Sequence, residues 1–248
     1  TTGEGGGISV VTAQRTSRQG NLRTIERLAA YTTDTRRPPA ISRAASLLDH
    51  LKKTGFEQLL AEHRAAWAQR WEDACVWIPD DREAQLAARF ALFHLWNNVA
   101  SRGEAAVGAR GLTGPGYAGH VFWDADVFVL PAMASMSPRA ARAMLEYRIR
   151  RLPQARTIAR LQGMDGARFP WESAAACYDV TPTSGPANEQ WVPILTGQLE
   201  EHIVADVAWA ACHYPARTGV PTFLAPPGRA RSTCPRPTRA PPPPPPPP

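Results

Sequence analysis

The amino-acid sequence predicts a mainly α-helical protein in which long loops separate the helices. In several segments apolar residues recur every three to four positions, which is the spacing of one buried helix face. Capping residues, Asp81 and Ser137-Pro138, precede two of these segments. Three connections, residues 102–122, 163–174 and 175–198, are so long that in a compact helical domain they carry function or are disordered. This alternation of helices and aromatic-bearing loops is typical of a helical toroid.

In the first third of the chain, the sequence predicts one strand and two helices. Residues 8–14 are rich in β-branched side chains, which favours a strand. In residues 41–72, apolar and aromatic side chains at helical spacing predict two amphipathic helices that are separated near Gly55.

Three further helical segments are predicted. The first follows Asp81 and runs to about residue 101, and the second follows Ser137 and is expected to be divided by Pro153. The third spans residues 200–214 and is expected to end at Pro215. The side chains expected to face inward are Leu86, Phe90, Phe93 and Leu95 or Trp96 in the first, Ala141, Leu145 and Ile149 in the second, and Ile203, Val207, Ala208 and Ala211 in the third.

The composition excludes several classes of protein. With 44% hydrophobic residues among 248, the chain is long enough for a sizeable core. No stretch approaches the roughly 18 apolar residues of a membrane-spanning helix, so no membrane partner is expected. A solvated helix face at residues 139–160 and an unfolded tail explain the charge of +6 without nucleic acid. Four scattered cysteines lack zinc-ligand spacing, which predicts reduced thiols, no metal, no cofactor and a cytoplasmic protein.

Both ends of the sequence are interpreted as boundaries that are not native. Residues 1–7 contain neither an initiator methionine nor an apolar leader, so we expect the N-terminus to be a cut end. The chain becomes Pro-rich at Pro226 and finishes in prolines 241–248, which form polyproline II or are disordered. A ligand for a proline-binding module is the alternative to a non-native continuation.

Two aromatic–acid pairs are the first candidate binding residues. Trp123-Asp124 follows a glycine-rich segment at residues 108–119, and Trp171-Glu172 lies in the second long loop, while a polar cluster at residues 200–202 opens the last helix. An indole can cover the C–H face of a sugar ring, and a carboxylate can accept hydrogen bonds from neighbouring hydroxyls. No Gly-Lys-Ser/Thr follows the glycines, so a phosphate loop is excluded. For each pair, a core aromatic beside a helix cap is the alternative.

Several motifs in order resemble glycoside hydrolase family 65. They are Ala109-Arg110-Gly111-Leu112-Thr113-Gly114, Gly119-His120-Val121-Phe122-Trp123-Asp124, Phe128-Val129-Leu130-Pro131, Leu145-Glu146-Tyr147-Arg148, Pro170-Trp171-Glu172-Ser173 and Glu201-His202-Ile203. The similarity covers residues 8–224 and implies an (α/α)6 barrel in enzymes that phosphorolyse or hydrolyse maltose, trehalose, kojibiose and similar α-glucosides. It implies that residues 1–40 are the remnant of an N-terminal β-sandwich with its linker, 41–79 linker helices, 80–225 the first part of an incomplete barrel, and 226–248 the Pro-rich tail.

The resemblance also implies roles for individual residues. Trp123 and Asp124 match positions that hold the non-reducing-end glucose, and Trp171 and Glu172 match positions towards the second sugar. The family inverts the anomeric centre, so one carboxylic acid protonates the leaving oxygen while phosphate or activated water attacks from the opposite face. The residues alone favour Glu172 as that acid, but the family's acid lies in a Gly-Pro-Asp-Glu-Tyr-His type segment that this sequence lacks. The substrate-binding candidates are Trp123, Asp124, Trp171, Glu172, His202 and Arg110.

Three hypotheses about function follow. The chain is part of an inverting α-glucoside phosphorylase or hydrolase, inactive alone, whose partners are an α-linked glucose disaccharide and, for a phosphorylase, inorganic phosphate as co-substrate. Alternatively, it is a non-catalytic sugar-binding remnant, or an unstable product in which Ile203, Val207 and Ala211 lack packing partners. The disaccharide linkage and the oligomeric state stay open, with a homo-oligomer of the full-length protein as one alternative.

Overall fold

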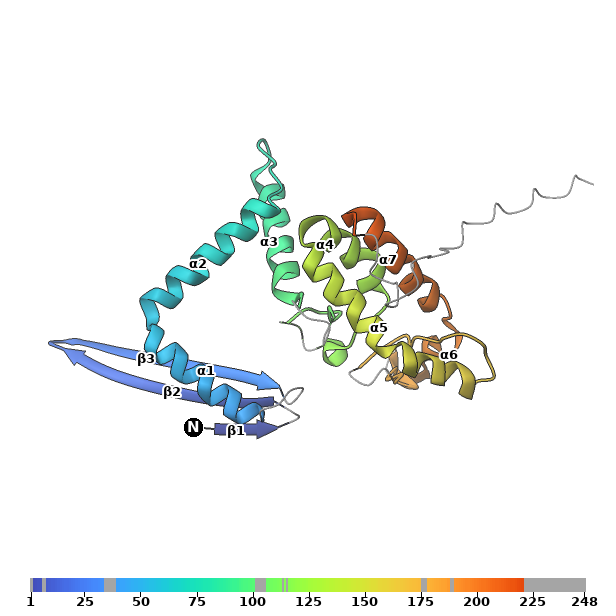
Figure 1. The fold of residues 1–248 in the computed structure, drawn as a ribbon, viewed down its shortest axis with the longest axis horizontal. Coiled ribbons are helices and arrows are strands. Elements are labelled where there is room, and N and C mark those ends of the chain that lie inside the picture. The colour runs from blue at the N-terminus through green and yellow to red at the C-terminus, as the bar shows by residue number, and fades with distance from the viewer. Residues whose placement is uncertain are drawn as a thin grey trace, which may run out of the picture. The chain divides into compact units, whose positions relative to one another are not determined.

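The computed structural model describes residues 2–5, 8–33, 39–100, 106–112, 114, 116–174, 178–187 and 190–220, so the predicted tail at 226–248 lies outside it. The chain forms two compact units, Thr1–Ala74 and Cys75–Pro248. Helices predominate and two small sheets accompany them (Figure 1), which confirms the predicted mainly helical class. Within the described ranges, no helix combines the length and the apolarity needed to cross a membrane.

The first unit begins with a three-stranded antiparallel sheet of β1 (Thr2–Gly5), β2 (Ile8–Gln19) and β3 (Leu22–Thr33). The predicted strand at residues 8–14 lies within β2, but β3 has no counterpart in the prediction. Gly20 and Asn21 form the turn between β2 and β3, and Gly20 has a φ of 59°, which glycine adopts without strain. A Gly-Asn dipeptide between two runs of residues is the signal that identifies this hairpin.

Two helices follow the sheet and confirm the predicted pair. They are α1 (Ala40–Thr54) and α2 (Phe56–Asp73), and they separate at Gly55, whose φ of 77° suits glycine. Helix α1 packs on β2 and β3 (Figure 1) and buries Ala44 and Leu48, which are four residues apart on one face.

The second unit begins with α3 (Arg82–Asn98), at the predicted position. Its inward face was predicted in part: Trp96 is buried and Leu95 packs against the core, as expected, but the other buried residue is Leu92. Apolar side chains occur on more than one side of this helix, so spacing alone does not identify the side that packs. The predicted core residues that are exposed are Leu86, Phe90 and Phe93.

The predicted aspartate cap of α3 is confirmed, and its contribution to stability can be measured. Asp81 accepts a hydrogen bond from the backbone N–H of Ala84 at 2.8 Å. Asp81→Ala is expected to lower the free energy of unfolding by about 1 kcal/mol, because it leaves that N–H without its partner. Urea unfolding measures the loss, with Asp80→Ala as the neighbouring control, for which a change within about 0.5 kcal/mol is expected. Equal losses in the two variants would contradict the capping role.

The core of the second unit lies among three helices and the π-helical turn η2 (Ala125–Val129). Helices α4 (Leu130–Met136), α5 (Pro138–Leu161) and α7 (Ile203–Thr218) contact one another, as Figure 1 shows. Their fully buried side chains include Leu130, Met133, Ala141, Leu145 and Ala210. This core supports the segments on which the candidate site lies.

Helix α5 continues through Pro153, so the prediction that this proline divides it was wrong. The helix is anchored on both sides of the proline, by Leu145 in one cluster and by Ala155 in another. These contacts outweigh the missing proline N–H, whose absence costs about 3 kcal/mol in an unsupported helix. The predicted face is confirmed at Ala141 and Leu145, whereas Ile149 is exposed.

Helix α7 also differs from its prediction at both ends. It begins at Ile203 rather than residue 200, and it runs through Pro215 to Thr218. Gly219 ends it in the left-handed conformation, with a φ of 70° and its N–H bonded to the carbonyl of Pro215 at 3.0 Å. The terminator is therefore the glycine.

The apolar face of α7 has packing partners, contrary to the expectation that Ile203, Val207 and Ala211 lack them. Ile203 and Val207 are buried in a cluster with Ala155 and Phe169, and Ala211 packs against the main core. Ala208, which was predicted to face inward, is exposed.

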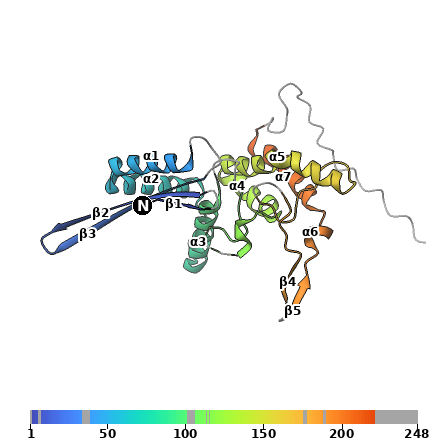
Figure 2. The same cartoon turned by 90° about the horizontal axis from the view of Figure 1, so that it is seen from below.

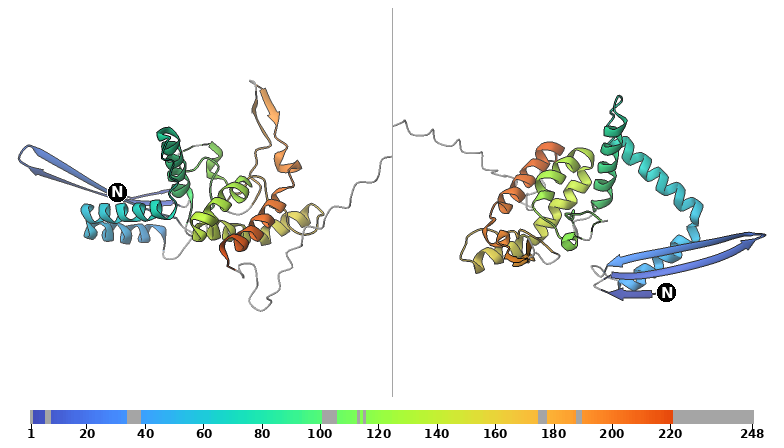
Figure 3. Two further views of the ribbon diagram at one scale, coloured as in Figure 1. Left: turned by 90° about the horizontal axis from the view of Figure 1, so that it is seen from above. Right: turned by 180° about the vertical axis from the view of Figure 1, so that it is seen from behind.

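The predicted long loop at residues 175–198 contains regular structure. A hairpin of β4 (Ser184–Ala187) and β5 (Gln190–Pro193) precedes the short helix α6 (Thr196–Leu199). The hairpin extends away from the helices of the second unit (Figure 2), and Figure 3 shows the same arrangement from another side. In the other two loops, the residues that the structure describes have mostly irregular backbone, apart from the 3-10 turn η1 (Gly116–Gly119).

Candidate functional site

The glycine-rich loop closes around the side chain of Arg110. A Cβ atom on Gly114 would lie 2.6 Å from Cβ of Arg110, so only glycine fits at this position. The Arg110 guanidinium lies over the ring of Tyr117, 5.7 Å from its centroid, a cation–π arrangement. Tyr117 itself has a φ of 59°, which is uncommon for a residue with a side chain. The loop thus presents Arg110 and Tyr117 together.

A short antiparallel bridge joins the first loop to the second. Val121 and Ser173 exchange backbone hydrogen bonds of 3.0 and 2.9 Å. Ser173 is fully buried, and its hydroxyl lies 2.9 Å from the hydroxyl of Tyr147 on α5. Since each bridge residue stands two positions from a tryptophan of the sequence motifs, the bridge brings Trp123 and Trp171 together.

The two indoles are neighbours in the folded chain. The ring centroids of Trp123 and Trp171 are 6.3 Å apart at an interplanar angle of 50°, and Phe122 meets Trp171 edge-on at 6.2 Å. Trp123 comes from the segment before η2, and Trp171 comes from the loop after α5. Residues 48 positions apart in the sequence therefore form one aromatic cluster.

This cluster borders a pocket of about 420 Å³. Asp124 is exposed at its edge, and among the described residues no group donates a hydrogen bond to its carboxylate. The carboxylate is therefore open to a ligand that carries hydroxyl groups. The described lining consists of Ala109, Arg110, Tyr117, Phe122, Trp123, Asp124 and Trp171.

Glu172 has a different environment from Asp124. Its side chain is 7% exposed, and its Oε1 lies 2.6 Å from Nδ1 of His120. This pair spans the same two loops as the Val121–Ser173 bridge. Glu172 is absent from the described lining of the pocket. Its carboxylate instead contacts His120.

His202 likewise contacts the cluster without being part of the described lining. It precedes α7, its ring lies 4.8 Å from that of Trp123, and its Nδ1 is 2.5 Å from Oδ2 of Asp206. Of the six candidates, the structure brings Arg110, Trp123, Asp124 and Trp171 to one pocket. Glu172 and His202 stand beside it.

A buried ion pair supports the site and was not predicted. Arg148 was expected on a solvated helix face, but it is 1% exposed and donates to Asp126 through Nη2 at 2.6 Å and Nε at 3.0 Å. Its Nη2 also donates to the carbonyl of Phe122, next to Trp123, at 3.1 Å. Burial raises the pKa of Asp126, while Arg148 opposes that rise. In the sequence, Arg148 stands three residues after the core residue Leu145. Residues at this spacing share a helix face, so the position could have indicated that Arg148 faces the core.

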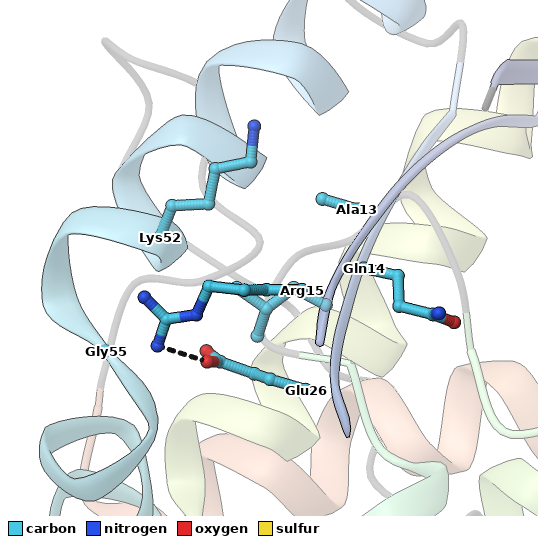
Figure 4. Close-up of a pocket in the computed structure, with 7 residues that line it drawn as sticks. Ala13, Gln14, Arg15, Glu26, Lys52 and Gly55 are labelled. Atoms are coloured by element: carbon cyan, nitrogen blue, oxygen red, sulfur yellow. Dashed lines mark hydrogen bonds and ion pairs between the residues drawn. The ribbon is translucent and has the colours of Figure 1, made fainter. Parts of the chain in front are cut away.

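A second pocket, of about 300 Å³, lies in the first unit (Figure 4). Its charged side chains already have partners: Arg15 pairs with Glu26 at 2.8 Å, and Lys52 pairs with Asp49 at 3.2 Å. Both pairs are exposed to solvent, and none of the predicted site residues lies there. We therefore place the candidate site in the second unit.

The second unit also matches a known family of catalytic domains. Residues 89–230 match the model of the glycosyl hydrolase family 65 central catalytic domain. The chain is 39% identical over 188 residues to a kojibiose phosphorylase of Halothermothrix orenii, which covers 74% of this chain and 24% of that protein. It is 37% identical over 170 residues to a kojibiose hydrolase of Flavobacterium johnsoniae, covering 68% and 24%. It is 32% identical over 208 residues to an alpha,alpha-trehalose phosphorylase of Thermoanaerobacter brockii, covering 83% and 26%.

A solved structure has the same fold. It is described as a candidate kojibiose phosphorylase from the human microbiome, and it superposes with a TM-score of 0.68 over 87% of this chain and 32% of that chain. At 18% identity this likeness concerns the fold alone. This chain spans about a quarter of the length of the curated relatives named above. Because the family model matches more than half of its residues, the chain belongs to glycosyl hydrolase family 65.

Proposed function

We propose that this chain carries the glucose-binding part of an inverting α-glucoside phosphorylase or hydrolase built on an (α/α)6 barrel. One observation carries the proposal: Trp123, Trp171 and the open carboxylate of Asp124 border a single pocket. An indole suits the C–H face of a pyranose, and a carboxylate suits two adjacent hydroxyls. Arg110 adds a fork of N–H donors at the same pocket.

The proposed substrates are α-linked glucose disaccharides, the class to which kojibiose and trehalose in the relatives' names belong. A phosphorylase would use inorganic phosphate as the attacking group, and a hydrolase would use water. In both cases inversion requires an acid that protonates the leaving oxygen. The sequence has no Gly-Pro-Asp-Glu-Tyr-His type segment, and Glu172 is committed to His120. We therefore expect this chain to bind sugar without turning it over.

The activity is tested by incubating the purified 248-residue protein with kojibiose, trehalose or maltose, each with and without phosphate. We expect neither glucose 1-phosphate nor free glucose above the blank, because the proposed general acid is missing. Robust release of either product would contradict this expectation. Glucose 1-phosphate formed only with phosphate would identify a phosphorylase, and glucose formed without phosphate would identify a hydrolase.

A non-catalytic sugar-binding role is the second candidate. The pairing of Glu172 with His120 favours it, since this carboxyl is buried and is not part of the described lining. Glucose titration followed by tryptophan fluorescence separates binding from turnover, because both indoles of the pocket report on a ligand placed against them.

A further inference from the structure

One histidine contacts both indoles of the pocket. The His202 ring centroid lies 4.8 Å from Trp123 and 6.0 Å from Trp171, at interplanar angles of 86° and 84°. Edge-to-face contacts of this kind are favoured between aromatic rings, so they restrain the tilt of each partner. The histidine precedes α7, whereas the two indoles come from separate loops. The His202 side chain therefore contacts both indoles that border the pocket.

The His202 ring is itself held by carboxylates. Its Nδ1 lies 2.5 Å from Oδ2 of Asp206, four residues later on the same helix face, and its Nε2 lies 3.5 Å from Oε2 of Glu200. Because both ring nitrogens face an acid, rotation of the imidazole would break both contacts. Asp206 also acts on Asp126: after burial, it is a further cause of the raised pKa of that carboxyl.

Within the described residues, no hydrogen bond fixes the indole of Trp123. Its Nε1 is buried, and in the part of the chain that the structure describes it has no acceptor. Packing must therefore set the orientation of this ring. Among the described residues, its ring contacts Phe128, Trp171 and His202, and the shortest of these contacts is with His202.

We propose that the Asp206–His202 pair is a positioning device that fixes the angle between the two indoles of the pocket. His202 acts through the tryptophans and does not itself hold the ligand. The consequence for sugar affinity rests on the function proposed above, whereas the consequence for indole geometry does not. The two consequences are therefore measured separately.

The first measurement is near-ultraviolet circular dichroism of the 248-residue protein. The signal of the Trp123–Trp171 pair is isolated as the difference from Trp123→Phe, which cancels the stacked Trp67–Trp71 pair of the first unit. We expect His202→Ala to lose most of this difference signal. Asp206→Ala should behave in the same way, whereas Asp206→Asn should retain the signal, because its amide oxygen still accepts from Nδ1.

The matched pair at Asp206 also covers the case in which His202→Ala fails to fold. A far-ultraviolet spectrum confirms the helical content of each variant before comparison. Retention of the difference signal in His202→Ala would overturn the proposal. So would equal signals in Asp206→Ala and Asp206→Asn, because a role through the hydrogen bond requires them to differ.

The second measurement is glucose titration by tryptophan fluorescence. His202→Ala is expected to weaken glucose binding by about three- to tenfold, the scale of one aromatic edge contact. If the unsubstituted protein shows no glucose response but the circular dichroism differences appear, the proposed function fails and the positioning role stands. If glucose binding weakens while the difference signal stays unchanged, His202 acts on the ligand directly and the positioning role is overturned.

Discussion

Replacing Arg148 with methionine is expected to lower the free energy of unfolding by about 3–5 kcal/mol, because it leaves the buried carboxylate of Asp126 without its partner. Both side chains of this pair are almost fully buried, at 1% and 3% exposure. The substitution also removes the hydrogen bond from Arg148 to the Phe122 carbonyl, so the segment that carries Trp123 loses one of its contacts. Urea unfolding followed by far-ultraviolet circular dichroism measures the loss.

Arg142→Met is the matched control on the same helix. Arg142 lies on the exposed face and pairs with Glu146 at 3.0 Å, a type of contact worth about 0–1 kcal/mol. A loss in Arg148→Met no larger than in Arg142→Met would show that the buried pair does not hold this part of the fold.

The loss of stability in Arg148→Met is expected to depend on pH. Burial raises the pKa of Asp126 in the folded state, and removing Arg148 removes the main effect that opposes this rise. The contribution of a group with a raised pKa is fully present below its unfolded pKa and is lost as pH rises through the folded value. The stability difference between the protein and Arg148→Met should therefore shrink as pH is lowered towards about 4. A difference that grows on acidification would contradict this assignment.

Asp124→Ala is expected to weaken strongly the glucose-dependent change in tryptophan fluorescence. The carboxylate is exposed at the pocket beside Trp123, and charge-assisted hydrogen bonds to sugar hydroxyls contribute about 1.5–3 kcal/mol, so affinity should fall about ten- to a hundredfold. The glucose affinity of Asp124→Asn should lie between those of the unsubstituted protein and Asp124→Ala, because the amide keeps an acceptor but loses the charge.

Asp165→Ala is the control for this titration, since Asp165 is an exposed acid outside the described lining of the pocket. It should leave the glucose response unchanged. An unchanged response in Asp124→Ala would remove Asp124 from the site.

Elements governed by neighbouring residues were predicted from the sequence. The break at Gly55 and the cap at Asp81 depend on backbone conformation and on a side chain three residues from its partner. The hairpin at Gly20 could have been predicted for the same reason. The effects of Pro153 and Pro215 could not, because tertiary contacts outweigh the local preference in each helix. Leu145 and Ala155 pack on either side of Pro153. Tyr214 is buried just before Pro215, and Arg217 after it donates to Ser135.

The candidate site divides in the same way. The sequence by itself determined the two tryptophan–acid pairs and the family, because both are carried by residue type and order. Only the tertiary structure decided that Asp124 opens to the pocket while Glu172 pairs with His120, and that Arg148 lies in the core. These outcomes depend on the bridge between Val121 and Ser173 and on the packing of α5, which join residues far apart in the chain. The spacing of residues along a sequence does not specify which of the two acids that follow a tryptophan meets solvent and which is buried.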